Sequence, residues 1–299
     1  MKDHLIRLIA DSGSTKTDWA LTGLADAPVI LHTQGINPFH QDADTIRAIL
    51  CNELLPQILG MMEHGEWKMD NKQFSTVNRQ FSISFYGSGV RPELEPLMES
   101  LLREVFTSHL SLTPRIEAHS DMLGAARALC GEHEGIACIL GTGANSCLYD
   151  GERIVMNTPP MGYILGDEGS GAVLGARFLN ALYKGRLPQS LLQAFEQSQQ
   201  LTMAQVIDRV YRQPLANRWL ASLSPFIHQF INIEAVHQLV VQNFHDFISH
   251  NIAPYHRPDL PLSAVGSIAH YYRDQLAEAA CHDGYTIGRI LRSPLDALE

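Results

Sequence analysis

The chain has 299 residues, of which 45% are hydrophobic and 18% are charged. This length suits two domains with cores of their own, and the composition is that of an ordinary globular protein. The formal net charge of -10 argues against broad binding to nucleic acid, although turns and helix N-termini can still bind a small anion. No apolar run approaches the roughly 20 residues needed to span a bilayer, and the five cysteines form no C-x-x-C pair. We therefore expect a cytoplasmic protein with neither a membrane nor a nucleic-acid partner.

The first third of the chain alternates strand and helix patterns. Apolar runs predict strands over residues 5–10, 18–22, 29–33, 80–86 and 115–118. Helical periodicity or composition predicts helices over residues 44–62, 92–106 and 122–129. Gly35 to Pro38 form a turn between the third strand and the first helix, because Gly, Asn and Pro together break regular structure.

The strand pattern then restarts at Ile136, ~130 residues after its first appearance. The residue pattern of the second half predicts strands over residues 136–140, 147–149 and 262–265. It predicts helices over residues 170–183, most of 187–251 and 269–281, with a proline-rich loop over 252–261. This weak repeat indicates a duplicated α/β unit, and we place the two domains at residues 1–118 and 119–299. Whether the last helix packs back on the first domain stays open.

Asp11-Ser12-Gly13-Ser14-Thr15-Lys16-Thr17 is a glycine-hydroxyl turn between two strands. It lacks the spacing of a P-loop, and it is no dinucleotide fingerprint because it leads into a strand rather than a helix. A carboxylate, small hydroxyl residues and one cation suit a magnesium-bound triphosphate, with Asp11 holding the metal through water and Lys16 adding charge. The hydroxyls and N–H groups of Ser14 and Thr15 would meet the phosphates. The alternative is a plain β-hairpin with turn-favouring residues.

Gly141-Thr142-Gly143-Ala144-Asn145-Ser146 is a second such turn. Its glycines permit the backbone to approach a ligand closely, and its three polar side chains exceed what an ordinary hairpin needs. The glycines could still be simple turn residues. Two hairpins that aim N–H and hydroxyl donors at an anion suggest that two halves of the molecule hold one polyphosphate.

Two carboxylates stand at predicted helix starts. Asp121 lies between a strand and a helix, where its plain role is an N-cap. Its alternative role is that of a catalytic base, since phosphoryl transfer to an alcohol needs a carboxylate to accept the hydroxyl proton. Asp167 lies in the glycine-rich segment Gly162 to Gly171, where it accepts hydrogen bonds from sugar hydroxyls or, as the plain alternative, Asp167 or Ser170 caps the next helix. The histidines form no recognised ligand pair, so we predict no structural metal.

Six motifs in this order resemble the N-acetylglucosamine kinase and BadF/BadG/BcrA/BcrD ATPase family, which belongs to the actin, hexokinase and Hsp70 superfamily. They are Asp11 to Asp18, Gly35 to Pro38, Asp121, Gly141 to Asn145, Gly166 to Ser170 and Gly266 to Ala269. The resemblance covers nearly the whole chain. It implies an α/β fold of two ribonuclease H-like domains (mixed sheets flanked by helices) around a nucleotide-binding cleft.

The same resemblance implies roles for individual residues. Asp121 matches the catalytic base, and Asp11 would sit near Mg²⁺. ATP and its phosphates would be bound by Asp11, Gly13, Ser14, Thr15, Lys16, Gly141, Thr142, Gly143, Gly266 and Ser267. The sugar would be bound by Asn37, Asn145, Gly162 and Asp167. The implied function is ATP-dependent phosphorylation of a hydroxyl of an amino sugar, with N-acetylglucosamine as the first candidate.

Other functions stay open beside this one. The loop Pro159-Pro160-Met161-Gly162 departs from the family pattern and leaves the amino-sugar preference and the phosphorylated hydroxyl undecided. An ATPase activator of a partner enzyme would hold a [4Fe–4S] cluster, but no two cysteines are close in sequence. A sugar or nucleotide sensor of the repressor type would carry a DNA-binding domain, whereas this chain enters its first hairpin within ten residues. Whether the chain forms a homodimer is also left open.

Overall fold

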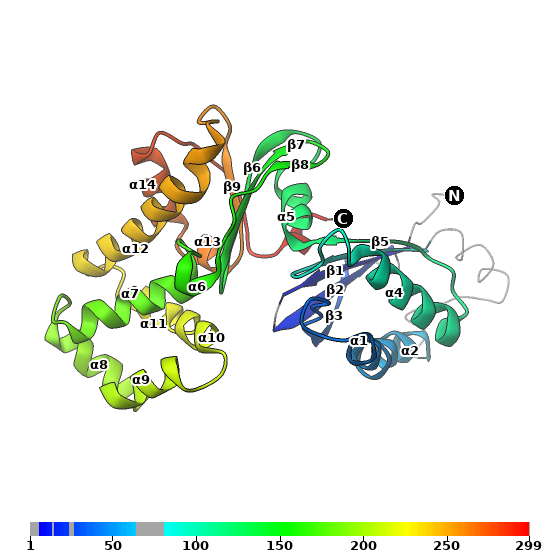
Figure 1. The fold of residues 1–299 in the computed structure, drawn as a ribbon, viewed down its shortest axis with the longest axis horizontal. Coiled ribbons are helices and arrows are strands. Elements are labelled where there is room, and N and C mark those ends of the chain that lie inside the picture. The colour runs from blue at the N-terminus through cyan, green and yellow to red at the C-terminus, as the bar shows by residue number, and fades with distance from the viewer. Residues whose placement is uncertain (1–5, 14, 24–26, 64–80, 299) are drawn as a thin grey trace. The chain divides into compact units, whose positions relative to one another are not determined.

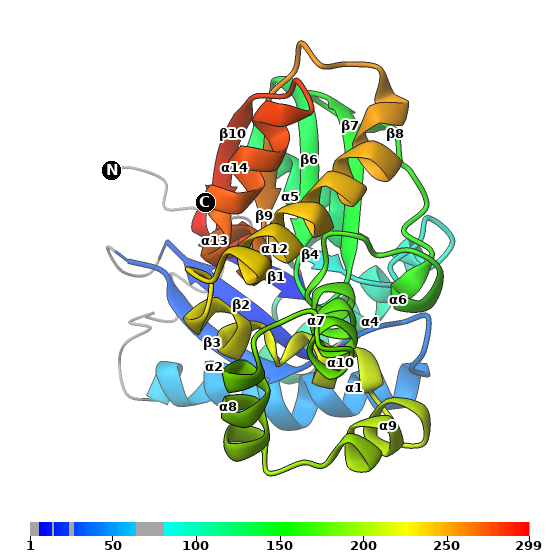
Figure 2. The same ribbon diagram turned by 90° about the vertical axis from the view of Figure 1, so that its left-hand side faces the viewer.

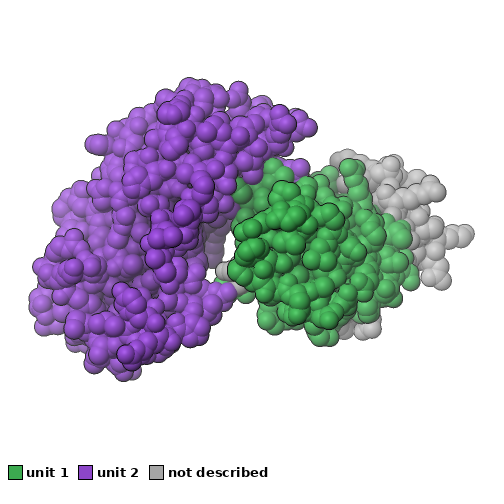
Figure 3. Space-filling model, in the orientation of Figure 1, with its two compact units in different colours: residues 1–124, 295–299 green, residues 125–294 purple. Residues whose placement is uncertain are grey.

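A computed structural model describes residues 6–13, 15–23, 27–63 and 81–298 (Figure 1). The chain divides into two compact units, which Figure 3 shows in different colours. Unit 1 comprises Met1–Gly124 with Leu295–Glu299, and unit 2 comprises Ala125–Pro294. The boundary between these units falls inside helix α5 (Asp121–Cys130). The predicted division into domains at residues 118 and 119 stays a prediction.

Unit 1 is built on a mixed sheet in the order β3-β2-β1-β4-β5. Its strands are β1 (Ile6–Ser12), β2 (Lys16–Thr22), β3 (Val29–Gln34), β4 (Phe81–Gly87) and β5 (Arg115–Ser120). The first three form an antiparallel meander, while β4 runs parallel to both β1 and β5. All five strands were predicted from alternating or continuous apolar runs. The parallel strands β1, β4 and β5 therefore end at one edge of the sheet.

Helices cover one face of this sheet. They are α1 (Ala43–Ile49), the π-helical turn η1 (Leu50–Leu54), α2 (Leu55–Glu63) and α4 (Glu95–Leu110). Their apolar faces share a core with Leu8, Phe85 and Phe106, all of which are fully buried. The helix predicted over residues 44–62 is confirmed, because the three segments follow one another without a break and the π-helical turn lies in the middle, where Leu50 and Leu54 are both buried.

Unit 2 repeats this architecture on a second mixed sheet in the order β10-β9-β6-β7-β8. Its strands are β6 (Glu134–Leu140), β7 (Ala144–Asp150), β8 (Ile154–Met156), β9 (Leu262–Val265) and β10 (Ile287–Leu291). Again the first three strands form a meander, and β9 runs parallel to β6 and β10. The strand order and directions match those of unit 1 position by position, which confirms the predicted duplication. The short edge strands β8 and β10 escaped prediction.

Unit 2 carries many more helices than unit 1 (Figure 2). They are α6 (Gly162–Leu165), α7 (Gly171–Tyr183), α8 (Gln189–Gln199), α9 (Met203–Tyr211), α10 (Ala216–Ala221), α11 (Ser224–Gln229), α12 (Glu234–Phe247), α13 (Ser267–Tyr271) and α14 (Arg273–His282). Short π and 3-10 turns cover Ile248–Ile252, Ala253–Tyr255 and Pro294–Asp296. The core between β6 and the helices includes Phe178, Phe244 and Tyr272.

Two boundaries in unit 2 differ from prediction. The expected loop over residues 252–261 begins with helical turns, because the chain leaves α12 through Ile248–Ile252 and Ala253–Tyr255. The expected helix over residues 269–281 is two helices, broken where Tyr272 departs from helical geometry at φ -110° and ψ 31°. Within the described part of the chain, no helix is both long and apolar enough to cross a membrane.

Candidate active site

The shared edge of β1, β4 and β5 gathers the predicted polar residues of unit 1. The register pairs Ser12 with Gly87 and Gly87 with Ser120. Gly13, Ser88 and Asp121 are therefore the next residues beyond the edge on three adjacent strands. In open α/β sheets, ligands bind outside the carboxyl ends of such strands.

Asp11 is largely buried beside two other carboxylates. Its pKa is raised from an ordinary 3.8 to about 7, first by burial and then by the negative charges of Asp121 and Asp18. Lys16 opposes this shift only weakly, because its Nζ pairs with Asp18 Oδ2 at 2.6 Å. Such an uncompensated carboxylate fits a divalent cation held directly or through water, since the cation would supply the missing positive charge.

The turn after Asp11 is exposed at Gly13, Thr15 and Lys16. The Gly13 N–H donates to the Lys16 carbonyl at 3.0 Å, which closes the hairpin. Ser14, which was predicted to meet the phosphates, lies outside the described residues. The side chain of Lys16 stays with Asp18 on the hairpin, so its predicted contact with phosphate requires it to exchange that partner.

Asp121 is the first residue of α5. Its Oδ1 accepts the Met122 N–H at 2.8 Å, while the Ser120 hydroxyl accepts the Leu123 N–H at 3.3 Å. Capping is thus shared with Ser120, and Asp121 is not the sole cap. Burial raises the pKa of Asp121 to about 6 and outweighs the lowering effect of the backbone N–H groups. A carboxylate with a raised pKa at a strand end is well suited to accept a proton.

Two buried hydroxyl groups hold the loop that carries Asn37. Ser12 Oγ and Thr17 Oγ1 are 2.6 Å apart, and both lie within hydrogen-bond distance of the Ile36 N–H, at 3.0 and 3.2 Å. Asn37 Oδ1 in turn accepts the Phe39 N–H at 3.0 Å. The hairpin therefore fixes the backbone of the predicted sugar-binding loop.

In unit 2 the second turn rests on the start of α7. The Gly171 and Ala172 N–H groups donate to the carbonyls of Gly141 and Thr142 at 2.8 and 3.1 Å. A Cβ atom at Gly143 would lie 3.1 Å from Asp167 Oδ2, so the turn and the Asp167 carboxylate are in close contact. These contacts place Asp167, predicted for the sugar, beside Gly141, Thr142 and Gly143, predicted for the phosphates.

Asp167 has two features that a plain helix cap does not need. Its backbone is left-handed at φ 52°, which is uncommon outside glycine. Burial raises its pKa to about 6, against the lowering effect of the Ala144 N–H. The cap of α7 is instead Ser170, whose side chain accepts the Val173 N–H. Ser170 rather than Asp167 therefore caps α7.

The remaining predicted residues of unit 2 lie around this turn. Asn145 Oδ1 accepts the Ser146 N–H and the Asn157 amide, both at 2.9 Å. Gly266 has φ 118°, and a Cβ there would lie 2.4 Å from the Leu140 carbonyl, so it allows β9 to end against β6. Ser267 begins α13. Gly162 is the exception, since it is exposed at the start of α6 with φ 74° and its carbonyl accepts the Gly166 N–H at 2.8 Å.

Sequence reasoning missed three supporting residues of unit 1. Ser12 and Thr17 were counted only as turn residues, yet they are buried and hold Ile36. Ser88 Oγ is buried without a hydrogen-bond partner at the sheet edge. The sequence does contain a signal for Ser88. A Gly-Ser pair stands at the end of the fourth strand in each repeat, at Gly87-Ser88 and at Gly266-Ser267.

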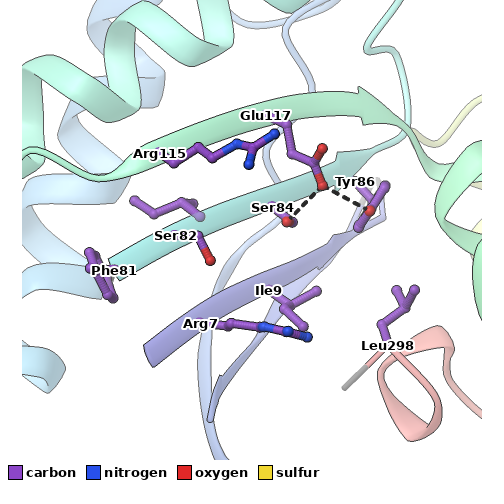
Figure 4. A pocket seen from close by; sticks show the side chains of 10 residues that line it. Arg7, Ile9, Phe81, Ser82, Ser84, Tyr86, Arg115, Glu117 and Leu298 are labelled. Carbon is purple, nitrogen blue, oxygen red and sulfur yellow. Dashed lines mark hydrogen bonds between the residues drawn. The ribbon is translucent and has the colours of Figure 1, made fainter. Parts of the chain in front are cut away.

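A separate hollow of about 420 Å³ lies on the face of the unit 1 sheet that carries Arg7, Ser82 and Arg115 (Figure 4). Its wall includes Glu117, which accepts hydrogen bonds from Ser84 Oγ at 2.8 Å and Tyr86 Oη at 3.3 Å. None of the predicted site residues lines it.

Two units share one repeated topology, each with a polar turn after its first strand, and this is the ribonuclease H-like α/β architecture expected from the sequence. No family model matches the chain. It is 47% identical to a solved Porphyromonas gingivalis protein assigned provisionally as an N-acetylglucosamine kinase, over 97% of this chain and 95% of that one, with a TM-score of 0.84. The chain therefore belongs to the N-acetylglucosamine kinase-like family.

Two further comparisons agree with this assignment. The chain is 26% identical to the N-acetyl-D-glucosamine kinase of Dictyostelium discoideum over 222 residues, which are 72% of this chain and 67% of that one. A Chromobacterium violaceum protein with the same provisional assignment is 18% identical, with 98% and 97% coverage and a TM-score of 0.69. At that identity the second likeness shows the fold alone.

Proposed function

We propose that the protein is a kinase that transfers the γ-phosphoryl group of MgATP to a hydroxyl of an amino sugar, N-acetylglucosamine first among the candidates. The observation that carries this proposal is Asp121, a half-buried carboxylate at the carboxyl edge of the unit 1 sheet, where desolvation raises its pKa to about 6. The names of the Porphyromonas and Dictyostelium proteins support the choice of sugar.

In this proposal Asp121 is the catalytic base. It accepts the proton of the attacking hydroxyl and orients that oxygen toward the γ-phosphorus. A pKa of about 6 leaves the carboxylate mostly ionised at neutral pH, while making it a stronger base than an ordinary aspartate. The proton leaves the sugar oxygen as the new phosphorus–oxygen bond forms and the bond to ADP breaks.

Asp11 is proposed to hold Mg²⁺ directly or through water. This carboxylate fits a cation, because burial and then the negative charges of Asp121 and Asp18 raise its pKa to about 7, and a bound cation would offset both effects. When bound, Mg²⁺ neutralises developing charge on the phosphates. The exposed backbone of Gly13 and Thr15 is proposed to face those phosphates, with Ser14 and Lys16 beside them.

The turn of unit 2 is proposed to supply further N–H and hydroxyl donors through Gly141, Thr142 and Gly143. Gly266 and Ser267 are proposed for the adenosine side. Sugar hydroxyls would be bound by Asp167, Asn145 and Asn37, with Gly162 opening the loop that covers them. Ionised carboxylates make strong hydrogen bonds to hydroxyl groups, which suits Asp167 to this part.

The cysteines do not support the alternative of an iron–sulfur activator. Cys138 and Cys147 are buried between strands of unit 2, and burial raises the pKa of both thiols. Cluster ligands must be thiolates, and a cluster shared by two copies needs them at the surface. Of the five cysteines, Cys281 alone is exposed.

The test is a coupled ADP-release assay over amino sugars and neutral hexoses with wild type, Asp121→Asn and Asp42→Asn. Asp42 caps α1 in the same unit, and asparagine caps equally well, so this variant is a matched control. We expect an amino sugar to stimulate ADP release, with a loss of about 100-fold or more in Asp121→Asn alone. MgATP binding should persist in that variant. Full activity in Asp121→Asn, or no stimulation by any sugar, would overturn the proposal.

A further inference from the structure

Three potential metal ligands meet at the ends of two helices of unit 2, and none of them is among the residues assigned above. His245 lies in the last turn of α12, His282 ends α14, and Asp283 follows it. One ligand atom from each of the three lies within 4.8 Å of the other two. His245 and Asp283 are half-buried, while the His282 side chain is 76% exposed.

The two imidazoles face the same carboxylate. His245 Nδ1 lies 2.9 Å from Asp283 Oδ2, and His282 Nδ1 lies 3.2 Å from Asp283 Oδ1. The two rings meet edge to face with centroids 4.7 Å apart. In a tetrahedral site with metal–ligand bonds of about 2.1 Å, neighbouring ligand atoms are about 3.4 Å apart. The two observed separations join the imidazoles to different oxygens of Asp283, so side-chain rotation is needed to place one carboxylate oxygen and both nitrogens around an ion; the ligand atoms already lie within 4.8 Å of one another.

The surroundings favour a cation at this place. The carbonyl groups at the C-terminal end of α14 carry partial negative charge, and His282 and Asp283 stand at that end. The carboxylate of Asp283 adds a full negative charge. The neighbouring Asp246 is already paired with Arg177, so it does not compete for the ion.

We propose that His245, His282 and Asp283 bind a divalent transition-metal ion, zinc in the first instance, which ties the end of α12 to the end of α14. Imidazole nitrogens select zinc, copper or nickel over magnesium, which prefers oxygen ligands. Water would fill the fourth position of the zinc ion. This site is independent of the proposed kinase activity.

The same two helices supply a matched control. His237 Nε2 pairs with Glu278 Oε2 at 2.7 Å, also between α12 and α14, but that pair is not part of the three-ligand group. Cys281 is exposed next to His282 and is a second source of zinc affinity. The variants His245→Ala, His282→Ala, His237→Ala and Cys281→Ser therefore separate the proposed site from its neighbours.

The experiment is isothermal titration of zinc into untagged, chelator-treated protein in a buffer with excess Mg²⁺. We expect one zinc ion per chain in wild type, His237→Ala and Cys281→Ser, and at least about tenfold weaker binding in His245→Ala and His282→Ala. Zinc should also raise the unfolding temperature of wild type and of His237→Ala, but not that of His282→Ala. Because His282 is exposed, its replacement leaves the core intact.

Absence of zinc binding in wild type would overturn the proposal. So would equal affinity in wild type and in both His245→Ala and His282→Ala, since the ion would then bind elsewhere. Loss of binding in Cys281→Ser with retention in His282→Ala would assign the affinity to the thiol instead. A cobalt titration checks the ligand set, because tetrahedral coordination by nitrogen and oxygen gives a visible spectrum distinct from that with thiolate.

Discussion

Gly89 makes room for the side chain of Asn37. A Cβ atom at position 89 would lie 2.1 Å from Asn37 Oδ1, a distance that real Cβ atoms do not show. The backbone of Gly89 is also left-handed at φ 80°. The conformation of the predicted sugar-binding asparagine therefore depends on a glycine more than fifty positions later in the chain.

Replacing Gly89 by alanine should displace the Asn37 side chain. We expect the KM for the sugar to rise by about tenfold or more, with the KM for MgATP within about twofold of wild type. Steady-state kinetics with each substrate varied in turn would measure both constants. Gly185→Ala is the matched control, because Gly185 is also left-handed at φ 67° but a Cβ there meets open space. Equal effects of the two substitutions would contradict the steric explanation.

Asp11→Asn should stabilise the metal-free protein at high pH. The folded-state pKa of Asp11 is about 7 against an ordinary 3.8, so wild type loses stability as the pH rises through this window. The variant lacks this carboxylate and therefore avoids the loss. We expect its free energy of unfolding to exceed that of wild type by about 1–3 kcal/mol at pH 8, after allowing for partial exposure of Asp11, and to equal that of wild type near pH 4. Urea unfolding without Mg²⁺ at several pH values would measure it. A variant less stable than wild type at pH 8 would contradict the buried-charge argument.

Sugar phosphorylation should fail in acid as Asp121 takes up a proton. With a pKa of about 6, the base is ionised above about pH 7, and kcat/KM should fall about tenfold per pH unit below 6. Rates at saturating MgATP between pH 5 and 8 would show this limb. The pKa of Asp167 is also about 6, so the Asp167→Asn variant separates the two groups. In this variant kcat/KM should be lower at neutral pH but should still fall below pH 6, because Asp121 is protonated there. A flat profile down to pH 5 would rule out Asp121 as the base.

Asp167→Asn tests the sugar side of the site. Asparagine can still accept the Ala144 N–H and tolerates the left-handed backbone, so only the charge is lost. We expect the KM for the sugar to rise by about tenfold or more, because hydrogen bonds to a charged group are worth about 1.5–3 kcal/mol. Glu168→Gln is the neighbouring control, since Glu168 pairs with His250 and Asn251 instead. A changed KM for MgATP alone would move Asp167 to the nucleotide side.

Thr17→Val should weaken unit 1 without changing its shape. Valine has nearly the same volume as threonine but lacks the hydroxyl near Ser12 Oγ and the Ile36 N–H. Ser12 then keeps fewer partners in a buried place, at a cost of about 1–3 kcal/mol. Urea unfolding measures the cost. Thr15→Val at the exposed tip of the same hairpin is the control, and we expect less than about 0.5 kcal/mol there.

Most of the fold could be predicted because apolar periodicity marks strands that are buried on one or both faces. Ile6 to Ala10 and Ile136 to Leu140 stand out for this reason. Strand β8 has three mostly exposed residues, and β10 contains Gly288 and Arg289, so neither carries an apolar pattern. The π-helical turn after Ile49 is set by tertiary packing and leaves no local mark in the sequence.

Part of the candidate site could likewise be predicted from the sequence, and part could not. Asp11, Asp121 and Asp167 are each marked by their place at a strand end or among glycines, and each is a half-buried carboxylate whose pKa desolvation raises. The roles assigned to them stay predictions. The pairing of Ser12 with Thr17, and the contact of Gly89 with Asn37, join residues that only the folded chain brings together. Contacts of that kind cannot be predicted from the residue pattern of one segment taken by itself.

The strand order of unit 1 has a consequence for how the chain matures during synthesis. The five strands described for its sheet have all been made once Ser120 has left the ribosome, and only residues 121–124 and the short tail Leu295–Glu299 of this unit come later. Domains generally fold as units from the N-terminus onward, so the β1–β4–β5 edge can assemble before most of unit 2 exists. The parts proposed to handle Mg²⁺ and the proton would then be in place first, and the nascent chain would add the second turn to a finished half.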